Sequence, residues 1–145
     1  NIVSNKDKID KDKKRAKQLL QKREDWTEII KKNIEYDYFS DKANEDDDDE
    51  LIEFVNLAVE VMVDVITSSK PITYIKGQEF PTQTVSNQMQ KITSSQIEYV
   101  WNCIKHNTTG IKNIQNYVLT SLYNAFNSES LYWQQVVNHN HPEFS

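Results

Sequence analysis

The sequence predicts a mainly α-helical fold, a compact helical bundle with a small β-hairpin around residues 72–80. Only 2 glycines and 3 prolines occur in 145 residues, too few for the turns of a β-sandwich or barrel. Apolar residues recur at helical spacing through most of the chain. The exception is Lys70–Pro81, where β-branched and aromatic residues surround a Lys-Gly pair, a pattern typical of a hairpin with its turn at the glycine.

The N-terminal part is basic and polar. Residues 1–10 have no apolar periodicity, and we expect them to be a linker, whereas Lys11–Glu24 has the composition of a helix. We expect a helix break near Asp25, where Asp25 or Thr27 could cap a second helix. The chain begins with Asn1 rather than Met, so we also expect it to be a piece of a longer protein.

These observations divide the chain into three parts. We predict a basic linker with an N-terminal helix over residues 1–24, a helical domain over residues 25–138 and a tail over residues 139–145. The number of residues fits one domain with one core.

Two patterns compete in Leu51–Ile66, which follows the acidic run Glu45–Glu50. Valines alternate at four positions, as in a strand, but the segment is longer than a usual strand. Polar residues instead form one stripe at helical spacing: Glu53, Asn56, Glu60 and Asp64. We predict a central helix that is buried on most sides, with the carboxylates of the run at its first turn, where the helix dipole favours them.

Further helices are predicted after the hairpin. Pro81 opens a short helix that extends to about Lys91, and Thr93 with Gln96 forms a capping box for the next one. The apolar face of that helix consists of Ile97, Val100, Trp101 and Ile104. After Gly110 a further helix carries apolar residues on two neighbouring faces: Ile114, Tyr117, Val118, Leu122 and Ala125, then Leu119, Tyr123 and Phe126.

The net charge of −5 is unevenly distributed. Residues 1–32 hold 11 basic and 6 acidic side chains, whereas residues 33–64 hold one lysine and 12 acidic side chains. This asymmetry is more typical of interaction proteins than of enzymes. The candidate nucleic-acid contacts on the basic arm are Lys11, Lys13, Lys14, Arg15 and Lys17. The alternative interpretation, a solvated helix with interleaved aspartates, is favoured for the chain in isolation.

No constellation typical of an enzyme emerges. We interpret Cys103 as a buried structural thiol, and His139 and His141 have no third metal ligand nearby. The acidic run lacks the spaced ligands of a calcium-binding loop. We therefore predict that the chain is not an enzyme and has no catalytic residues, metal or other cofactor. A single cysteine and the lack of a membrane-spanning apolar run favour a cytoplasmic location.

From Trp26 onward the sequence resembles a known family. The segments that carry the resemblance are IIKKNIEYDYF at Ile29–Phe39, ITYIKGQEFP at Ile72–Pro81, the stretch Lys91–Ala125, and VNHN at Val137–Asn140. Together they resemble the C-terminal domain, itself of unknown function, of RepA-type replication initiators. These initiators occur on plasmids and mobile elements of low-GC Gram-positive bacteria.

The domain also resembles, more distantly, the helical domain of the primosome protein DnaD. That domain has a tyrosine, an aliphatic residue four positions later and a tryptophan eight positions later. Here Tyr117 matches, but Ser121 and Ala125 occupy the other two positions, so the DnaD contact residues do not carry over.

The resemblance implies a module that recruits host primase or replicative helicase to an origin, which an upstream winged-helix domain would bind. A DNA-binding or remodelling module and an initiator oligomerisation domain are the alternatives. We expect the aromatic residues to contact a partner groove or helix, and the acidic run to attract a basic partner surface. The partner-binding candidates are Tyr117, Tyr123, Phe126, Asp46, Asp47, Asp48 and Asp49.

Overall fold

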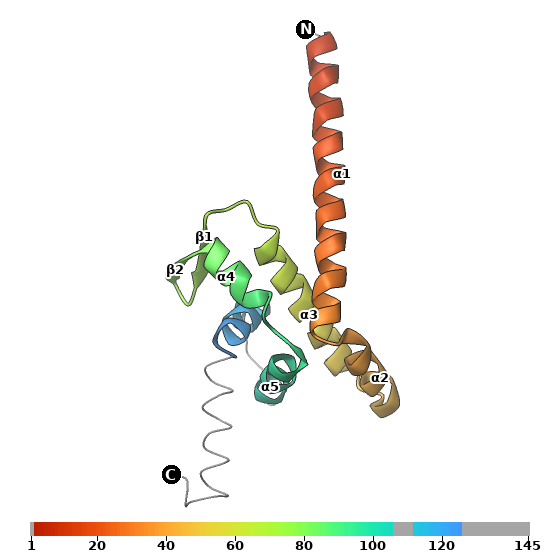
Figure 1. The fold of residues 1–145 in the computed structure, drawn as a ribbon, viewed down its shortest axis with the longest axis vertical. Coiled ribbons are helices and arrows are strands. Elements are labelled where there is room, and N and C mark those ends of the chain that lie inside the picture. The colour runs from red at the N-terminus through yellow and green to blue at the C-terminus, as the bar shows by residue number, and fades with distance from the viewer. Residues whose placement is uncertain (1, 106–111, 126–145) are drawn as a thin grey trace, which may run out of the picture.

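The computed structural model describes residues 2–105 and 112–125 and confirms the mainly α-helical fold with one small hairpin (Figure 1). In chain order the elements are α1 (Ile2–Asn33), α2 (Tyr36–Asp46), α3 (Asp49–Ile66), β1 (Ile72–Ile75), β2 (Gln78–Pro81), α4 (Thr82–Met89) and α5 (Ser94–Ile104). Residues 114–125 form another helix. Our predictions for Gly110, Phe126, the two C-terminal histidines and the tail lie outside the described residues.

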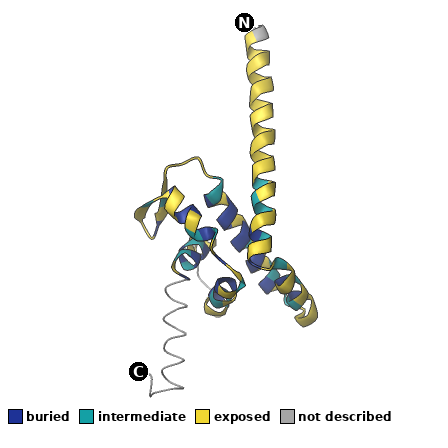
Figure 2. Ribbon diagram, viewed as in Figure 1, coloured by how far each residue is buried: buried dark blue, intermediate teal, exposed yellow. Residues whose placement is uncertain are grey.

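Helix α3 is the centre of the core, as predicted. It packs against α1, α2, α4 and α5. Nine of its 18 side chains are buried, and all four positions of the stripe predicted to be polar are exposed (Figure 2). Its fully buried side chains include Val55, Ala58 and Met62. The sequence pattern was decisive here because a period near 3.6 residues, not 2, separates the polar positions.

Helix α1 corrects two predictions. It runs without a break from Ile2 to Asn33, so the helix expected from Lys11 already begins at Ile2, and no second helix starts near Asp25. The hydroxyl of Thr27 does not cap a helix; it donates to the carbonyl of Arg23 one turn earlier, at 2.7 Å. Arg23 in turn forms an ion pair with Asp64 of α3 at 2.8 Å. This ion pair joins α1 to α3 close to the position where the break was expected.

The acidic run is divided between two helices, which corrects the prediction that all of it precedes α3. Glu45 and Asp46 lie in the last turn of α2, and Asp47 ends that helix with a left-handed backbone (φ 52°). Asp48 caps α3 by accepting a hydrogen bond from the backbone N–H of Leu51 at 3.1 Å. Only Asp49 and Glu50 occupy the first turn of α3, where the helix dipole favours carboxylates.

The hairpin and the capping box are confirmed. Strands β1 and β2 pair antiparallel with Ile75 opposite Gln78, and Lys76-Gly77 forms the turn. Pro81 precedes the first residue of α4 as its N-cap. The backbone N–H of Thr93 donates to the side-chain oxygen of Gln96 at 2.8 Å at the start of α5. The predicted apolar face of α5 packs into the core with Trp101 only partly buried.

The helix of residues 114–125 follows its predicted pattern only in part. Val118, Leu122 and Ala125 are fully buried, but Ile114 and Tyr117 are each 37% exposed. The buried face is therefore narrower than the sequence pattern indicated. Over residues 2–105 and 112–125, no helix combines the length and apolar character needed to cross a membrane.

Met62 of α3 is fully buried, so its replacement by alanine removes packing contacts in the core and leaves an empty space there. We expect Met62→Ala to lower the free energy of unfolding by about 2–5 kcal/mol. Glu60→Ala, at an exposed position of the same helix, is the control and should change it by less than about 0.5 kcal/mol. Urea unfolding followed by circular dichroism measures both, and equal effects would contradict the central position of α3.

Candidate functional site

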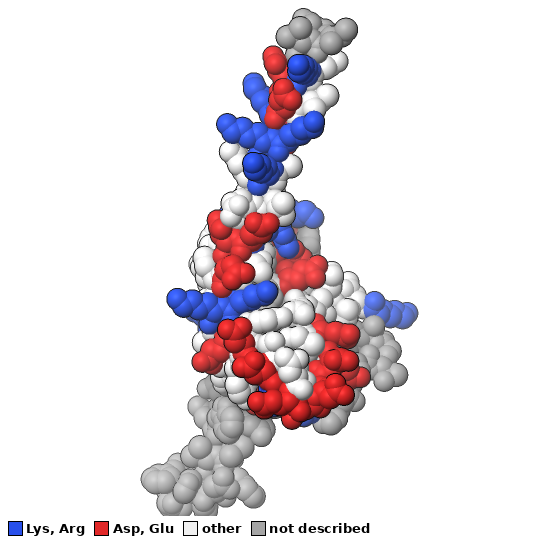
Figure 3. All heavy atoms as spheres, turned by 90° about the vertical axis from the view of Figure 1, so that its right-hand side faces the viewer, with Lys and Arg blue, Asp and Glu red and all other residues white. Residues whose placement is uncertain are grey.

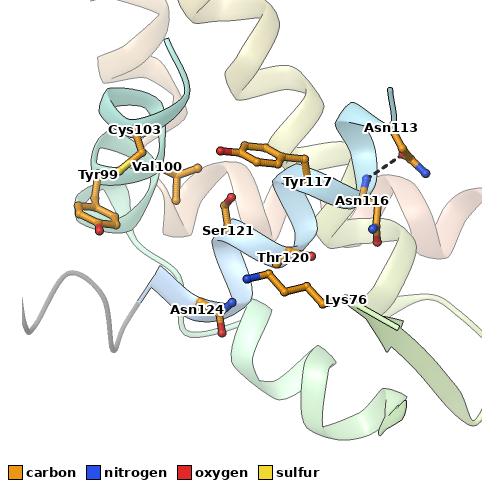
Figure 4. Close-up of a pocket in the computed structure, with 10 residues that line it drawn as sticks. All are labelled: Lys76, Tyr99, Val100, Cys103, Asn113, Asn116, Tyr117, Thr120, Ser121 and Asn124. Atoms are coloured by element: carbon orange, nitrogen blue, oxygen red, sulfur yellow. Dashed lines mark hydrogen bonds between the residues drawn. The ribbon is translucent and has the colours of Figure 1, made fainter. Parts of the chain in front are cut away.

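A surface cavity of about 440 Å³ lies where the hairpin turn, α5 and the helix of residues 114–125 meet (Figure 4). Segments far apart in the sequence line it: Lys76, Tyr99, Val100, Cys103, Asn113, Asn116, Tyr117, Thr120, Ser121 and Asn124. Apart from Val100, each of these side chains carries a polar atom, and none is acidic. The cavity therefore suits a neutral or anionic group better than a cation.

The helix of residues 114–125, together with its cap Asn113, contributes six of the ten lining residues. Asn113, Asn116, Thr120 and Asn124 follow one another at spacings of 3, 4 and 4 residues, which places them on one helix face. Asn113 caps the helix by accepting a hydrogen bond from the backbone N–H of Asn116 at 3.0 Å. The opposite face is buried in the core. The core thus fixes a stripe of amides and hydroxyls against the cavity.

Thr120 has an unused hydrogen-bonding group in this wall. Its residue is only 7% exposed, and its hydroxyl Oγ1 has no hydrogen-bond partner among the residues described. A buried hydroxyl without a partner costs about 1–3 kcal/mol. A ligand that supplies a donor or acceptor at this point would recover that cost.

Lys76 is the basic residue that lines the cavity, and its backbone conformation is unusual. Lys76 and Gly77 both have positive φ, 52° and 73°, the combination that a type I′ hairpin turn requires. Asn, Asp and Gly are favoured there, because a side chain such as lysine is strained in the left-handed region. The turn nevertheless directs the Lys76 side chain across the helix of residues 114–125 (Figure 4). Strain of this kind is concentrated at functional sites in proteins.

Cys103 is exposed, so its interpretation as a buried thiol is wrong. It lies on α5 immediately before the buried Ile104, just off the face that packs into the core, and its side chain lines the cavity instead. In Figure 4 the ring of Tyr117 extends from its own helix toward this part of α5. Within the described ranges, no group of three or more His, Cys, Asp or Glu residues is placed to hold a metal ion.

Of the three predicted aromatic contacts, the two that the structure describes have different surroundings. Tyr117 is 37% exposed and lines the cavity. Tyr123 is partly buried and packs against Phe80 of β2, with ring centroids 5.2 Å apart, so it holds the hairpin to the helix. Phe126 lies outside the described residues. Tyr117 alone is therefore both accessible and in a concave site.

The predicted acidic contacts lie elsewhere. Asp46, Asp47, Asp48 and Asp49 surround the junction of α2 and α3, and none of them lines the cavity. In Figure 3 acidic side chains gather over the lower part of the molecule, whereas basic side chains are concentrated on the projecting helix. The two predicted partner-binding sets are thus separate surfaces.

The predicted nucleic-acid contacts lie on the N-terminal arm, defined here as residues 4–22 of α1. Every residue of the arm is exposed, and it projects from the body (Figures 1 and 2). It carries eight basic and three acidic side chains. Lys11, Lys13, Lys14, Arg15 and Lys17 are all accessible, although they are distributed around the helix rather than on one face.

Sequence reasoning missed Lys76, Thr120, Ser121 and the three asparagines as site residues. The polar stripe at 113, 116, 120 and 124 has the same helical spacing that identified the exposed face of α3, so it was detectable. Lysine at a turn position that favours asparagine or glycine was a second signal. Their convergence was not detectable, because it depends on how the hairpin packs against the helix.

The fold and the cavity define a mainly α-helical domain with a polar surface cavity and a projecting basic arm. The chain belongs to DUF6017, a family of unknown function, whose model matches residues 8–142. The matched range includes most of the arm as well as the body. Neither a search of curated proteins nor one of solved structures finds a match to the chain.

Lys76 offers a way to separate stability from binding. Lys76→Asn creates the Asn-Gly pair that a type I′ turn favours, so we expect the free energy of unfolding to rise by a few tenths to about 1 kcal/mol. Urea unfolding checks this, with Lys70→Asn in the loop before β1 as the control. A loss of stability in Lys76→Asn would contradict the strained turn and leave Lys76 with a structural role.

Proposed function

We propose that the chain is a non-catalytic interaction domain of a plasmid replication initiator and that it recruits host primase or replicative helicase to the origin. The observation that carries this proposal is the cavity around Tyr117. All ten lining residues fall within Ile72–Pro81 and Lys91–Ala125, two of the segments that resemble the C-terminal domain of RepA-type initiators. The cavity is thus built entirely from two of the four resembling segments.

The lining chemistry supports a protein partner. Tyr117 supplies an amphipathic aromatic contact, a residue type enriched among the residues that dominate interface energies. Amide and hydroxyl side chains of the lining can form hydrogen bonds with the backbone of a segment that enters the cavity. Such a segment would also supply the hydrogen-bond partner that the Thr120 hydroxyl lacks among the described residues. Lys76, with no acidic neighbour in the lining, favours a segment that carries a carboxylate. The reaction chemistry of replication would belong to the recruited enzymes.

Removing the Tyr117 ring tests the proposal. With the wild-type chain immobilised, we expect purified primase or replicative helicase from a low-GC Gram-positive host to bind. Tyr117→Ala should weaken that binding about 30-fold or more, the effect of losing one dominant interface residue. Lys76→Asn should also weaken it while preserving stability.

Tyr38→Ala is the matched control. Tyr38 is 49% exposed, lies on α2 and does not line the cavity. Its replacement should leave the affinity within about twofold. Failure of both replication proteins to bind the wild-type chain, or equal losses for the two tyrosine variants, would reject the proposal.

A second candidate function is binding of duplex or single-stranded DNA through the arm. The specific observation in its favour is that all eight basic side chains of the arm are exposed on a helix that projects from the body. Lysines and arginines on such a helix can neutralise phosphates without reading sequence, and affinity then falls steeply with salt. In this function the helical body would be the scaffold.

Replacing Lys11, Lys13, Lys14, Arg15 and Lys17 together with glutamine tests the DNA function. If the arm binds DNA, the logarithm of the association constant falls with the logarithm of the salt concentration. The negative slope of this plot should become shallower by about 0.7–0.9 for each phosphate that the variant no longer neutralises. The control replaces five exposed lysines outside the arm: Lys32, Lys70, Lys91, Lys105 and Lys112. Fluorescence anisotropy at several salt concentrations measures both variants, and equal slopes would exclude the arm.

A further inference from the structure

The arm carries an apolar stripe that no part of the described chain covers. Ile9, Leu19 and Leu20 are 53%, 54% and 58% exposed. With Ala16 they lie on one face of α1: Ala16 follows Ile9 by 7 residues, and Leu19 and Leu20 follow Ala16 by 3 and 4. Asp12 is the acidic residue on this face, between Ile9 and Ala16. Large aliphatic side chains exposed to this extent along one helix face indicate a contact surface rather than a solvated helix.

Cationic residues border this stripe on both sides. At 100° per residue, Lys13 and Lys17 flank it beside Leu20, and Arg15 and Lys22 flank it beside Leu19. A surface that covers the stripe should therefore be apolar in its centre and acidic at its rim. The arm cannot fold back onto its own body, because α1 is one uninterrupted helix that leads away from it (Figure 1).

A surface of that description lies on the body. A cleft of about 360 Å³ is formed by α3, α5 and the start of the helix of residues 114–125. Its lining is apolar except for two carboxylates: Phe54, Leu57, Trp101, Ile104 and Ile114, with Glu50 and Glu53. Trp101 is partly buried and stacks on Phe54 with ring centroids 5.3 Å apart. The cleft adjoins the acidic run, since Glu50 is its last residue.

We propose that the arm of one copy of this chain docks, around Leu19 and Leu20, into the acid-rimmed cleft of a second copy. The two leucines would cover the apolar lining, and the flanking lysines and arginine would face Glu50, Glu53 and the rest of the acidic run. Charge complementarity supports this occupant, because the arm carries +5 and residues 33–64 carry −11. This interaction is independent of the cavity around Tyr117.

Charge also argues against the simplest alternative, a coiled coil of two arms. Two helices of charge +5 would lie side by side with their flanking cations opposed. In the proposed arrangement the two arms do not touch, because each arm lies on the body of the other copy. Each contact is between unlike surfaces, and a two-fold dimer closes it when each arm occupies the cleft of the other copy.

Sedimentation velocity of the full chain tests the proposal with two variants. Leu19→Glu/Leu20→Glu disables the arm, and Glu50→Lys/Glu53→Lys reverses the cleft rim. The wild-type chain should self-associate, more weakly at high salt, and each variant alone should show a dimer Kd at least about tenfold higher. Circular dichroism spectra should match that of the wild type, because all four positions are exposed. Unfolding curves should show at most a small loss for the cleft variant, since Glu50→Lys places a cation in the first turn of α3.

The decisive measurement is made on a mixture of the two variants. The cleft variant has an intact arm and the arm variant has an intact cleft, so the mixture should form a heterodimer through one restored contact. A charge-matched control, Glu24→Lys/Glu28→Lys, changes exposed residues of α1 outside the cleft and should not abolish self-association. A wild-type chain that stays monomeric at high micromolar concentration, or variants that fail to complement each other, would overturn the proposal.

Discussion

Nine of the 18 side chains of α3 are apolar and buried, so other elements have to pack around this helix on several sides. Helices α1, α2, α4 and α5 do so. Because α4 and α5 pack against α3, and the hairpin packs against α4, the hairpin turn and α5 are brought to the cavity that Tyr117 and Lys76 line. The packing on α3 also explains the arm: α1 has 32 residues and α3 has 18, so at 1.5 Å per residue α1 is about 20 Å longer than the helix it packs against.

Local signals in the sequence predicted local structure well. The polar stripe of α3, the Lys-Gly turn and the Thr93 capping box each depend on residues close in the chain, and each is confirmed. The break expected at Asp25 is wrong because the end of α1 packs against α3, a contact distant in sequence that buries Ile30 completely and Trp26 in part. The cavity was not predictable for the same reason: Lys76 and Thr120 are 44 positions apart and meet only after the hairpin has packed.

The candidate surfaces differ in chemistry and share no lining residue. The cavity is polar, has one lysine and contains no carboxylate, which suits a segment of a protein partner. The arm is basic with an apolar stripe, and the cleft beside the acidic run is its chemical complement. A dimer joined arm to cleft, as proposed, would bring two cavities into one assembly, and the two proposed contacts would not compete for the same residues.

Hydrogen–deuterium exchange of the full chain, with and without the host primase or helicase, tests the central claim most directly. The account predicts that exchange slows in residues 113–125 and around the turn at Lys76, while the arm of residues 4–22 is unaffected by the added protein. Slower exchange confined to the arm, or no change in any peptide at saturating partner, would contradict a recruitment surface at the cavity.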